Sequence, residues 1–265
     1  MMKKAIVFDN SGTLTERYRA IKKIRTGKIC DFISSLDLVE YKKNRALVVL
    51  QTDPASCIIN ARPDQTIYDF ITRNNIDLGI SYSNVNITKE EILNILKEDA
   101  SKVRDIQDTI RAVLDRGYDI EICSGSGFIL NIEKRMVEFT ITAGGKLFPE
   151  VLDVVSELKR RNIDIYVASG DRKGALEKLA ITINIPTSNV FATVDTKGKA
   201  LVIRRLKRKY DKVMMVGDGL NDILALKEAD VGVLTLQQNN KVHEKLLKAA
   251  DIVIYNIREI LDIKF

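Results

Sequence analysis

The chain has 265 residues, of which 45% are hydrophobic and 29% charged, so it can bury one large core or two smaller ones. No apolar run approaches the roughly 20 residues that a membrane-spanning helix needs, and the start does not resemble a signal peptide. Three cysteines, none in a C-x-x-C pair, and one histidine argue against a disulfide framework, a structural zinc site and a serine–histidine triad. We therefore expect a cytoplasmic protein with no membrane segment.

The net charge of +6 is compatible with phosphorylated substrates or with nucleic acid. The densest basic run, residues 204–209, lies on a predicted amphipathic helix and is interrupted by Leu206. No aromatic residues are interleaved with it, as a nucleic-acid platform would require. The run therefore indicates a solvated helix face, and we do not expect a nucleic-acid partner.

The first predicted element is a short buried strand over residues 4–8, which ends at Asp9. A turn containing Gly12 follows directly. This arrangement holds a carboxylate at the carboxyl edge of a sheet, where α/β folds place their chemistry.

Residues 31–142 have a mixed pattern that we interpret as an inserted α+β domain. Thr88 and Glu91 have the spacing of a capping box, which predicts a helix start. Asp53-Pro54 indicates a turn between two strands. The expected elements are strands over 47–50 and 57–59, helices over 89–98 and 101–116, and a hairpin of 128–132 with 136–141.

From residue 143 onward, apolar strand patterns alternate with helical ones. The expected strands are 163–168, 190–192, 212–216, 231–234 and 252–254. This alternation is typical of parallel βαβ units, and the first strand must join the same sheet. The sequence thus predicts a Rossmann-like, doubly wound, mostly parallel α/β core of residues 1–30 and 143–265, with 31–142 as an α+β cap inserted after the first motif.

Two acidic turns in this core predict a magnesium site. Asp9 follows the first strand, and Asp218 follows strand 212–216, with Asp222 four residues further on. Carboxylates that meet at one sheet edge can hold Mg²⁺ beside a nucleophilic aspartate. Alone, Asp9 could equally be an Asx-turn residue and 218–222 a helix N-cap, but their joint occurrence after correctly placed strands favours the metal site.

Two further positions could bind a phosphate. Ser169-Gly170 lies between a strand and a helix, where a hydroxyl and backbone N–H groups can bind an anion, although a simple loop would look the same. Lys199 begins the helix before strand 212–216 and could neutralise charge on a transferred phosphoryl group. Taken alone, it could also be a surface lysine.

Four segments, in order, resemble the motifs of the haloacid dehalogenase (HAD) superfamily. The likeness is greatest to the phosphorylation domain of P-type ATPases, which carry Asp-Lys-Thr-Gly-Thr-Leu-Thr, Thr-Gly-Asp and Gly-Asp-Gly-x-Asn-Asp. The matching segments here are Asp9-Asn-Ser-Gly-Thr-Leu-Thr15, Ser169-Gly-Asp171, Lys199 and Gly217-Asp-Gly-Leu-Asn-Asp222.

The resemblance implies a role for each matching residue. Asp9 would attack phosphorus and form an aspartyl-phosphate, and Asp9, Asp218 and the Ser11 carbonyl would bind Mg²⁺. Asp222 would complete the metal site. Phosphate binding would fall to Gly12, Ser169, Gly170, Lys199 and Asn221, and Gly12 and Thr13 would also shape the loop.

Two residues depart from the family patterns. Asn10 replaces the lysine of the pumps. Ser11 replaces the aspartate that acts as general acid/base in most HAD phosphatases, so it bears directly on catalysis, and the pumps also lack that aspartate. We find neither the Thr-Gly-Glu actuator motif nor membrane helices, and therefore expect no ion transport.

The insertion lies where the pumps carry their nucleotide-binding domain. Helix 101–116, the Ser124-Gly-Ser-Gly127 segment and the following hairpin resemble the corresponding part of heavy-metal pumps. A flexible turn before a hairpin would give the same Gly-x-Gly pattern.

We therefore expect a Mg²⁺-dependent phosphohydrolase that acts on a small phosphate monoester or ATP through an aspartyl-phosphate at Asp9. One alternative is a phosphotransferase of the same fold, because no water-activating base is evident. Another is a non-catalytic nucleotide-binding regulatory protein.

Overall fold

The computed structural model describes residues 2–118, 125–238 and 242–265, and it divides the chain into two compact units. The first unit consists of Met1–Arg17, Lys146–Ser169 and Leu176–Phe265. The second consists of Tyr18–Gly145 and Gly170–Ala175. Each unit has its own sheet and its own core.

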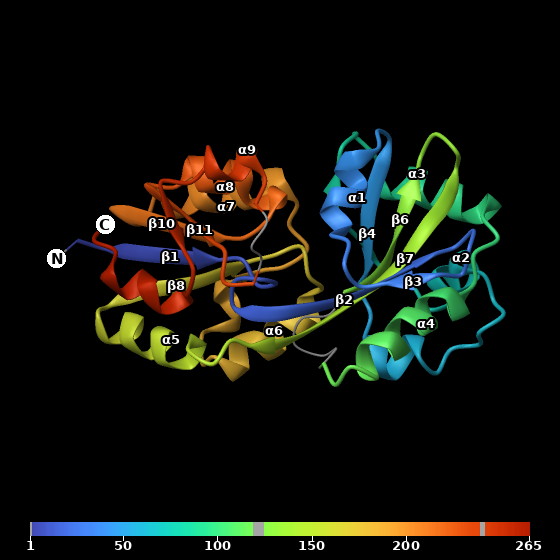
Figure 1. The fold of residues 1–265 in the computed structure, drawn as a ribbon, viewed down its shortest axis with the longest axis horizontal. Helices are drawn as coiled ribbons and strands as arrows, with labels where there is room; N and C mark the ends of the chain where they lie inside the picture. The colour runs from blue at the N-terminus through green and yellow to red at the C-terminus, as the bar shows by residue number, and fades with distance from the viewer. Residues whose placement is uncertain (1, 119–124, 239–241) are drawn as a thin grey trace. The chain divides into compact units, whose positions relative to one another are not determined.

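The first unit is built on a six-stranded sheet in the order β12-β11-β10-β1-β8-β9, and all its strand pairs are parallel (Figure 1). Strand β1 runs through the middle, and its buried Ala-Ile-Val-Phe run suits a strand covered on both faces. The strands are β1 (Lys4–Phe8), β8 (Ile163–Ala168), β9 (Val190–Phe191), β10 (Lys212–Gly217), β11 (Val231–Thr235) and β12 (Ile252–Ile254).

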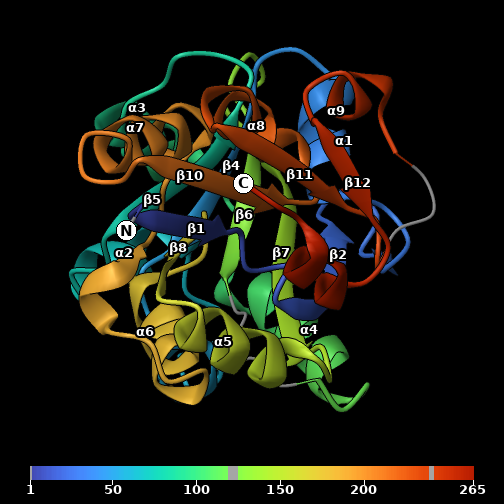
Figure 2. The ribbon, with the colours of Figure 1, turned by 90° about the vertical axis from the view of Figure 1, so that its left-hand side faces the viewer.

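Helices cover both faces of this sheet, as Figure 2 shows. One face packs against α5 (Val151–Arg160), α6 (Lys173–Thr182) and the 3-10 helix η4 (Ile257–Asp262). The opposite face packs against α7 (Thr196–Leu206), α8 (Ile223–Glu228) and α9 (Glu244–Leu247). The predicted doubly wound parallel sheet is therefore confirmed.

Most predicted elements of this unit are present, with shifted ends. Helix α7 begins at 196 rather than 198, because the Asp195 side chain caps it by accepting the N–H of Gly198 at 2.7 Å. The helix expected near Asn221 begins as a 3-10 turn, η3 (Leu220–Asp222), before α8. A further 3-10 turn, η2 (Thr187–Asn189), leads into β9.

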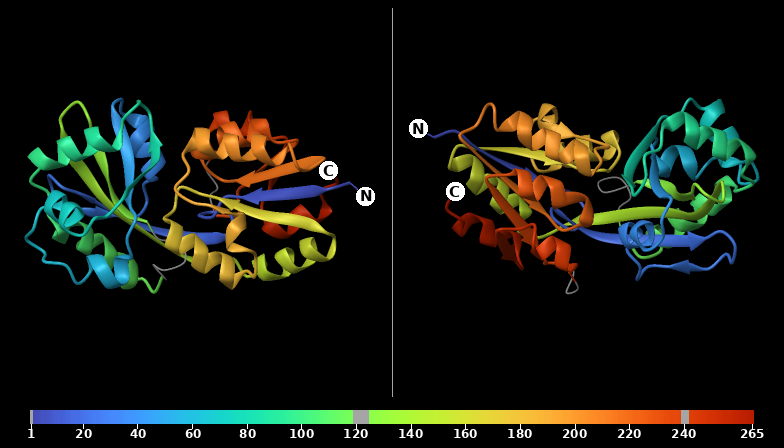
Figure 3. Two further views of the ribbon diagram at one scale, coloured as in Figure 1. Left: turned by 180° about the vertical axis from the view of Figure 1, so that it is seen from behind. Right: turned by 90° about the horizontal axis from the view of Figure 1, so that it is seen from above.

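The second unit has a six-stranded sheet in the order β3-β2-β7-β6-β4-β5 (Figure 3). Its β2–β3, β4–β5, β4–β6 and β6–β7 pairs are antiparallel. The strands are β2 (Thr15–Lys23), β3 (Ile29–Cys30), β4 (Arg45–Leu50), β5 (Leu78–Ser83), β6 (Ser126–Asn131) and β7 (Met136–Leu147).

Helices pack on both faces of this sheet. On one face, α2 (Ile67–Arg73), α3 (Lys89–Glu98) and α4 (Val103–Leu114) bury a large apolar cluster. On the other face, α1 (Ser35–Tyr41) covers a smaller cluster that includes Val39 and Ile129 (Figure 1). The unit is thus a mixed α+β fold, as the pattern of residues 31–142 predicts.

Several local predictions for this unit are confirmed. Thr88 and Glu91 form the expected capping box, in which the Thr88 N–H donates to the Glu91 carboxylate at 2.7 Å. Helix α4 ends before Gly117, which has a φ of 71°. Strands β6 and β7 pair as the predicted hairpin.

The predicted strand over 57–59 is wrong. Residues Pro54–Ile58 form a single helical turn, η1, because the Asp53 side chain accepts the N–H groups of Ala55 and Ser56. Asp53 therefore initiates a helical turn where the Asp-Pro pair suggested a reversal between strands. The neighbours of β4 are β5 and β6.

The Gly-x-Gly segment enters the sheet. Ser124 lies outside the described residues, but Gly127 belongs to β6 and pairs with Val49 and Ile141. A β-carbon at Gly127 would lie 2.0 Å from the Val48 carbonyl oxygen, so the absence of a side chain permits close strand approach. The interpretation as a flexible turn is therefore wrong at Gly127.

The second unit extends beyond the insertion expected over residues 31–142. It takes in residues 18–30, because β2 and β3 lie at one side of its sheet, and also residues 170–175. Within the described ranges, no helix is both long and apolar enough to cross a membrane.

Candidate active site

The loop after β1 places Asp9 at the carboxyl edge of the first sheet. The Asp9 N–H donates to the Val216 carbonyl of β10 at 2.8 Å, which extends the strand pairing to the acidic residue. The Asn10 carbonyl then accepts the N–H groups of Thr13, Leu14 and Thr15. Asn10 is fully buried, and its side-chain oxygen accepts a hydrogen bond of 3.2 Å from the Thr15 hydroxyl. Asn10 therefore joins the two ends of this loop.

Lys199 lies between two carboxylates. Its ammonium group is 2.7 Å from Asp9 Oδ1 and 2.7 Å from Asp222 Oδ1, and its side chain has no solvent exposure. Burial lowers the pKa of Lys199, but the charges of Asp222 and Asp9 outweigh burial and hold the pKa above its ordinary value. Lys199 is therefore a permanent cation beside Asp9, and not a surface lysine.

Asp222 holds the loop that carries Asp218. Its Oδ2 atom accepts the N–H groups of Asp218 at 3.1 Å and Gly219 at 3.0 Å, while its Oδ1 atom binds Lys199. Burial, opposed by Lys199 and reinforced by Asp9 and Asp218, raises the pKa of Asp222 to about 7. Both carboxylate oxygens of Asp222 thus have partners within the protein.

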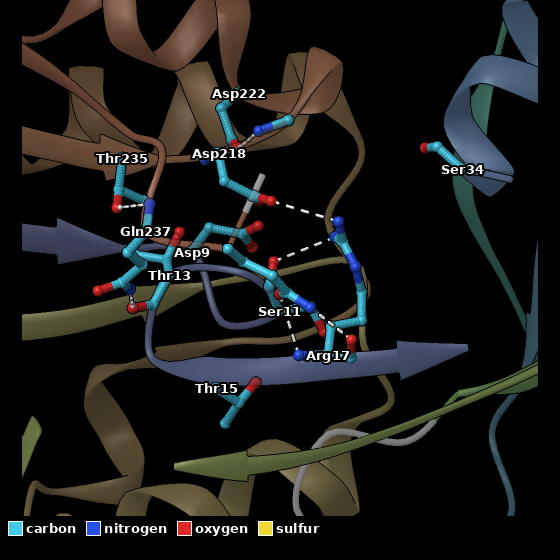
Figure 4. Close-up of polar contacts among 12 residues, drawn as sticks. Asp9, Ser11, Thr13, Thr15, Arg17, Ser34, Asp218, Asp222, Thr235 and Gln237 are labelled. Carbon is cyan, nitrogen blue, oxygen red and sulfur yellow. Dashed lines mark hydrogen bonds and ion pairs between the residues drawn. The ribbon is translucent and has the colours of Figure 1, made fainter. Parts of the chain in front are cut away.

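Asp218 points towards the loop after β1, as Figure 4 shows. A β-carbon at Gly12, whose φ is +89°, would lie 2.1 Å from Asp218 Oδ2. The Arg17 guanidinium is 3.3 Å from the same oxygen. The Asp218 carboxylate is therefore confined between the Gly12 backbone and a cation.

The cluster has the chemistry of a site for a hard divalent cation. Ligand oxygens of Asp9, Asp218 and Asp222 all lie within 4.8 Å of one another. The Ser11 carbonyl lies near this cluster in that it accepts a hydrogen bond from Arg17, whose guanidinium also contacts Asp218 (Figure 4). Carboxylate and carbonyl oxygens are the ligands that Mg²⁺ prefers, so these residues fit the expected ion.

Two of the expected phosphate-binding residues, Ser169 and Asn221, lie on turns of the first unit. Ser169 directly follows β8 and is 3% exposed; its N–H donates to the Phe191 carbonyl and its carbonyl accepts the Val194 N–H. Asn221 lies in η3, one residue before Asp222, and is buried. Gly170 is grouped with the second unit, where a β-carbon would lie 2.2 Å from Ser81 Oγ.

Thr13 has a buried hydroxyl that makes no hydrogen bond among the described residues. Its carbonyl accepts the Gln237 side-chain amide at 2.6 Å (Figure 4). A buried hydroxyl with no protein partner costs free energy unless something else binds it. Thr13 is therefore a donor available to an anion in this loop.

Sequence reasoning missed two residues of this site, Arg17 and Gln237. Gln237 follows β11, and its side-chain oxygen also accepts the Ile257 N–H at 2.9 Å, so it ties the loop after β1 to η4. Its position just after a parallel strand was a usable signal, because such positions lie at the carboxyl edge of the sheet, where α/β folds bind their ligands. Arg17 follows the motif within β2 and carried no comparable signal.

A parallel sheet with three carboxylates and a buried lysine at its carboxyl edge defines a class of α/β enzymes that act on anionic groups with a divalent cation. Comparison with known proteins agrees. The family model described as haloacid dehalogenase-like hydrolase matches residues 3–230, and the chain belongs to this family. The predicted enzyme class, a HAD-type phosphohydrolase, is thereby confirmed.

Among its relatives is the soluble P-type ATPase-like phosphatase of Methanocaldococcus jannaschii, 38% identical over 99% of this chain and 93% of that protein. Mus musculus phosphoserine phosphatase is 35% identical over 32% of this chain and 47% of that protein. The probable copper-importing P-type ATPase A of Enterococcus hirae is 30% identical over 35% of this chain and 13% of the pump. A solved structure described as a phospho-aspartyl intermediate analogue of phosphoserine phosphatase aligns over 99% of both chains, with 17% identity and a TM-score of 0.45.

Proposed function

We propose that the protein is a Mg²⁺-dependent phosphohydrolase that forms an aspartyl-phosphate at Asp9. The observation that carries this proposal is the ion-paired cluster in which Lys199 bridges Asp9 and Asp222 beside Asp218. A merely structural aspartate at the end of a strand would not require a fully buried lysine and two further carboxylates.

Asp9 is the nucleophile in this proposal. One of its carboxylate oxygens forms a bond to phosphorus while the bond between phosphorus and the ester or anhydride oxygen breaks. The released oxygen takes a proton from water. In the second step a water oxygen attacks phosphorus, the Asp9–phosphorus bond breaks, and inorganic phosphate leaves.

Metal binding is assigned to Asp9, Asp218 and the Ser11 carbonyl. When bound, Mg²⁺ supplies the positive charge that allows a carboxylate and a phosphate to approach each other. Asp222 completes the site in this proposal: with Oδ1 on Lys199 and Oδ2 on two backbone N–H groups, it positions Asp218.

Phosphate binding is assigned to Lys199, Ser169, Gly170 and Asn221, with the Thr13 hydroxyl as a further donor. Lys199 is the strongest of these, because its raised pKa keeps it charged at any physiological pH. A fixed cation beside the attacking oxygen stabilises charge on the transferred group without reorganisation.

The substrate in this proposal is a small phosphate monoester or ATP, and the second unit, with residues 31–142 at its centre, is its cap. Two relatives that are named as phosphatases support a phosphorylated substrate. One matches 99% of this chain and the other matches 32% of it. A reducing compartment such as the cytoplasm suits the free thiols of Cys30 and Cys57.

A phosphotransferase of the same fold is the second candidate, and Ser11 favours it. Ser11 stands two residues after the nucleophile, where a serine cannot activate water as a carboxylate can. Transfer of the phosphoryl group to another hydroxyl would need no such base if that acceptor brought its own.

The test is the Asp9→Asn variant, assayed with a generic phosphomonoester and with ATP, each with and without Mg²⁺. We expect phosphate release and acid-stable labelling of the protein to vanish in this variant. Asp153→Asn is the matched control, because Asp153 lies exposed on α5 and should leave both unchanged. Phosphate release that survives in Asp9→Asn would overturn the mechanism, and labelling without phosphate release in the unaltered chain would favour transfer.

A further inference from the structure

Arg17 contacts two of the groups assigned to the metal. Its guanidinium is 3.3 Å from Asp218 Oδ2 and donates a hydrogen bond of 3.3 Å to the Ser11 carbonyl. Figure 4 shows the guanidinium between them. The Asp218 side chain is 4% exposed and that of Arg17 is 13% exposed, so water screens this ion pair only weakly.

The backbone of Arg17 is fixed at the edge of the sheet. Its N–H donates to the Gln238 side-chain oxygen at 3.0 Å, and the Gln238 amide donates back to the Arg17 carbonyl. Gln238 follows β11 on the same edge as the carboxylates. These two hydrogen bonds fix the backbone of Arg17 close to Asp218, so only its side chain is able to move.

We infer that Arg17 is a displaceable internal cation that sets the affinity of the site for Mg²⁺. This inference rests on the metal site proposed above. The guanidinium neutralises Asp218 and holds the Ser11 carbonyl in place when no metal is bound. A divalent ion would bind the same two oxygens, and its charge would repel the guanidinium, so Arg17 moves away as the metal enters.

The displaced side chain has somewhere to go. Arg17 is partly exposed, so its long side chain can move the guanidinium into water while its backbone stays on Gln238. Breaking the Arg17–Asp218 pair costs free energy, and this cost makes the net binding of the metal weaker. Removal of the guanidinium should therefore tighten metal binding.

The experiment measures Mg²⁺ binding to the metal-free full chain by calorimetry. For Arg17→Gln we expect the Kd for Mg²⁺ to fall by about fivefold to tenfold relative to the unaltered chain, as loss of a well-desolvated charged partner predicts. Arg204→Gln is the matched control: it removes the same charge from an exposed pair with Glu228 and should leave the Kd unchanged.

Arg17→Lys distinguishes the effect of contacting Asp218 and the Ser11 carbonyl together from the effect of the positive charge alone. Lysine keeps the charge but cannot donate to both acceptors from a planar fork, so its Kd should lie between those of the unaltered chain and Arg17→Gln. Thermal unfolding gives a second measure: without metal Arg17→Gln should melt below the unaltered chain, and Mg²⁺ should raise its Tm by more. This measurement also shows whether the variant is folded.

Two results would overturn the inference while leaving the proposed function intact. One is an equal Kd for the unaltered chain and Arg17→Gln, with binding lost in Asp218→Asn. The other is a Kd for Arg17→Gln above that of the unaltered chain, which would show that the guanidinium assists metal binding instead of competing with it. Absence of Mg²⁺ binding in the unaltered chain and in Arg17→Gln would instead reject the metal site itself, and the inference with it.

Discussion

The backbone of Gly12 passes so close to Asp218 that a β-carbon at residue 12 would lie 2.1 Å from the Asp218 carboxylate. The two residues are more than 200 positions apart in the sequence, and they meet because β1 and β10 are neighbours in the sheet. The contact leaves no room for any side chain at residue 12. It therefore links the loop of the proposed nucleophile directly to a carboxylate of the proposed metal site.

Gly12→Ala should disable the site. Its φ of +89° costs an alanine about 1–2 kcal/mol, and the added carbon must also push Asp218 away. We expect a lower free energy of unfolding in denaturant titration, weaker Mg²⁺ binding, and a loss of turnover of about 100-fold or more, as displacement of catalytic groups by about 1 Å can cause.

Gly27→Ala is the control for Gly12→Ala. Gly27 has a φ of +67° with nothing within 4 Å of a β-carbon, so it incurs the backbone strain without the clash. It should lose a similar amount of stability but retain turnover and Mg²⁺ binding. Equal turnover in the two variants would contradict the importance of the contact between Gly12 and Asp218.

Lys199→Met should destabilise the protein strongly. It leaves Asp9 and Asp222 buried and adjacent without their shared cation, a change that typically costs about 3–5 kcal/mol. We expect the free energy of unfolding to fall by that amount in urea titration, with turnover lost. Added Mg²⁺ should restore part of the stability, because the ion supplies positive charge to the same carboxylates.

Lys207→Met provides the comparison at the other end of the same helix. Its pair with Asp230 is partly exposed, so its removal should cost less than about 1 kcal/mol. A Lys199→Met variant as stable as Lys207→Met would show that the two aspartates do not depend on the buried ammonium.

Ser11→Asp should speed breakdown of the phosphoenzyme. A carboxylate at this position can take a proton from the attacking water, and general base catalysis contributes typically about 10²–10⁴ in rate. The measurement is the rate at which label is lost from enzyme phosphorylated beforehand. Ser11→Asn has nearly the same shape without the base, so equal rates for the two variants would contradict this role.

The sequence predicts the fold because its signals are local. The apolar runs after residue 143 alternate with helical stripes, and this alternation alone indicates a parallel doubly wound sheet. The Thr88–Glu91 capping box likewise depends only on residues three apart. The error at 57–59 is also local, since Asp53 can start either a turn or a helix and only its contacts with Ala55 and Ser56 decide.

The extent of the second unit was harder to predict. Strand β2 continues directly from the loop after β1, and its pairing with distant β7 makes residues 18–30 part of the second sheet. Strand pairing over more than 100 residues leaves no local mark on the sequence, because period-two alternation does not specify a partner.

By itself, the sequence determined which carboxylates follow buried strands and are therefore the candidates for chemistry. A carboxylate directly after a buried strand must lie at the sheet edge, so Asp9 and Asp218 could be identified from strand ends alone. Only the tertiary structure decided how these groups are connected: that Lys199 joins Asp9 to Asp222, that Asp222 clamps the loop of Asp218, and that Arg17 lies against Asp218 and Ser11. The physical reason is that an ion pair depends on distance in space, and for residues some 200 positions apart the packing of the sheet alone sets that distance.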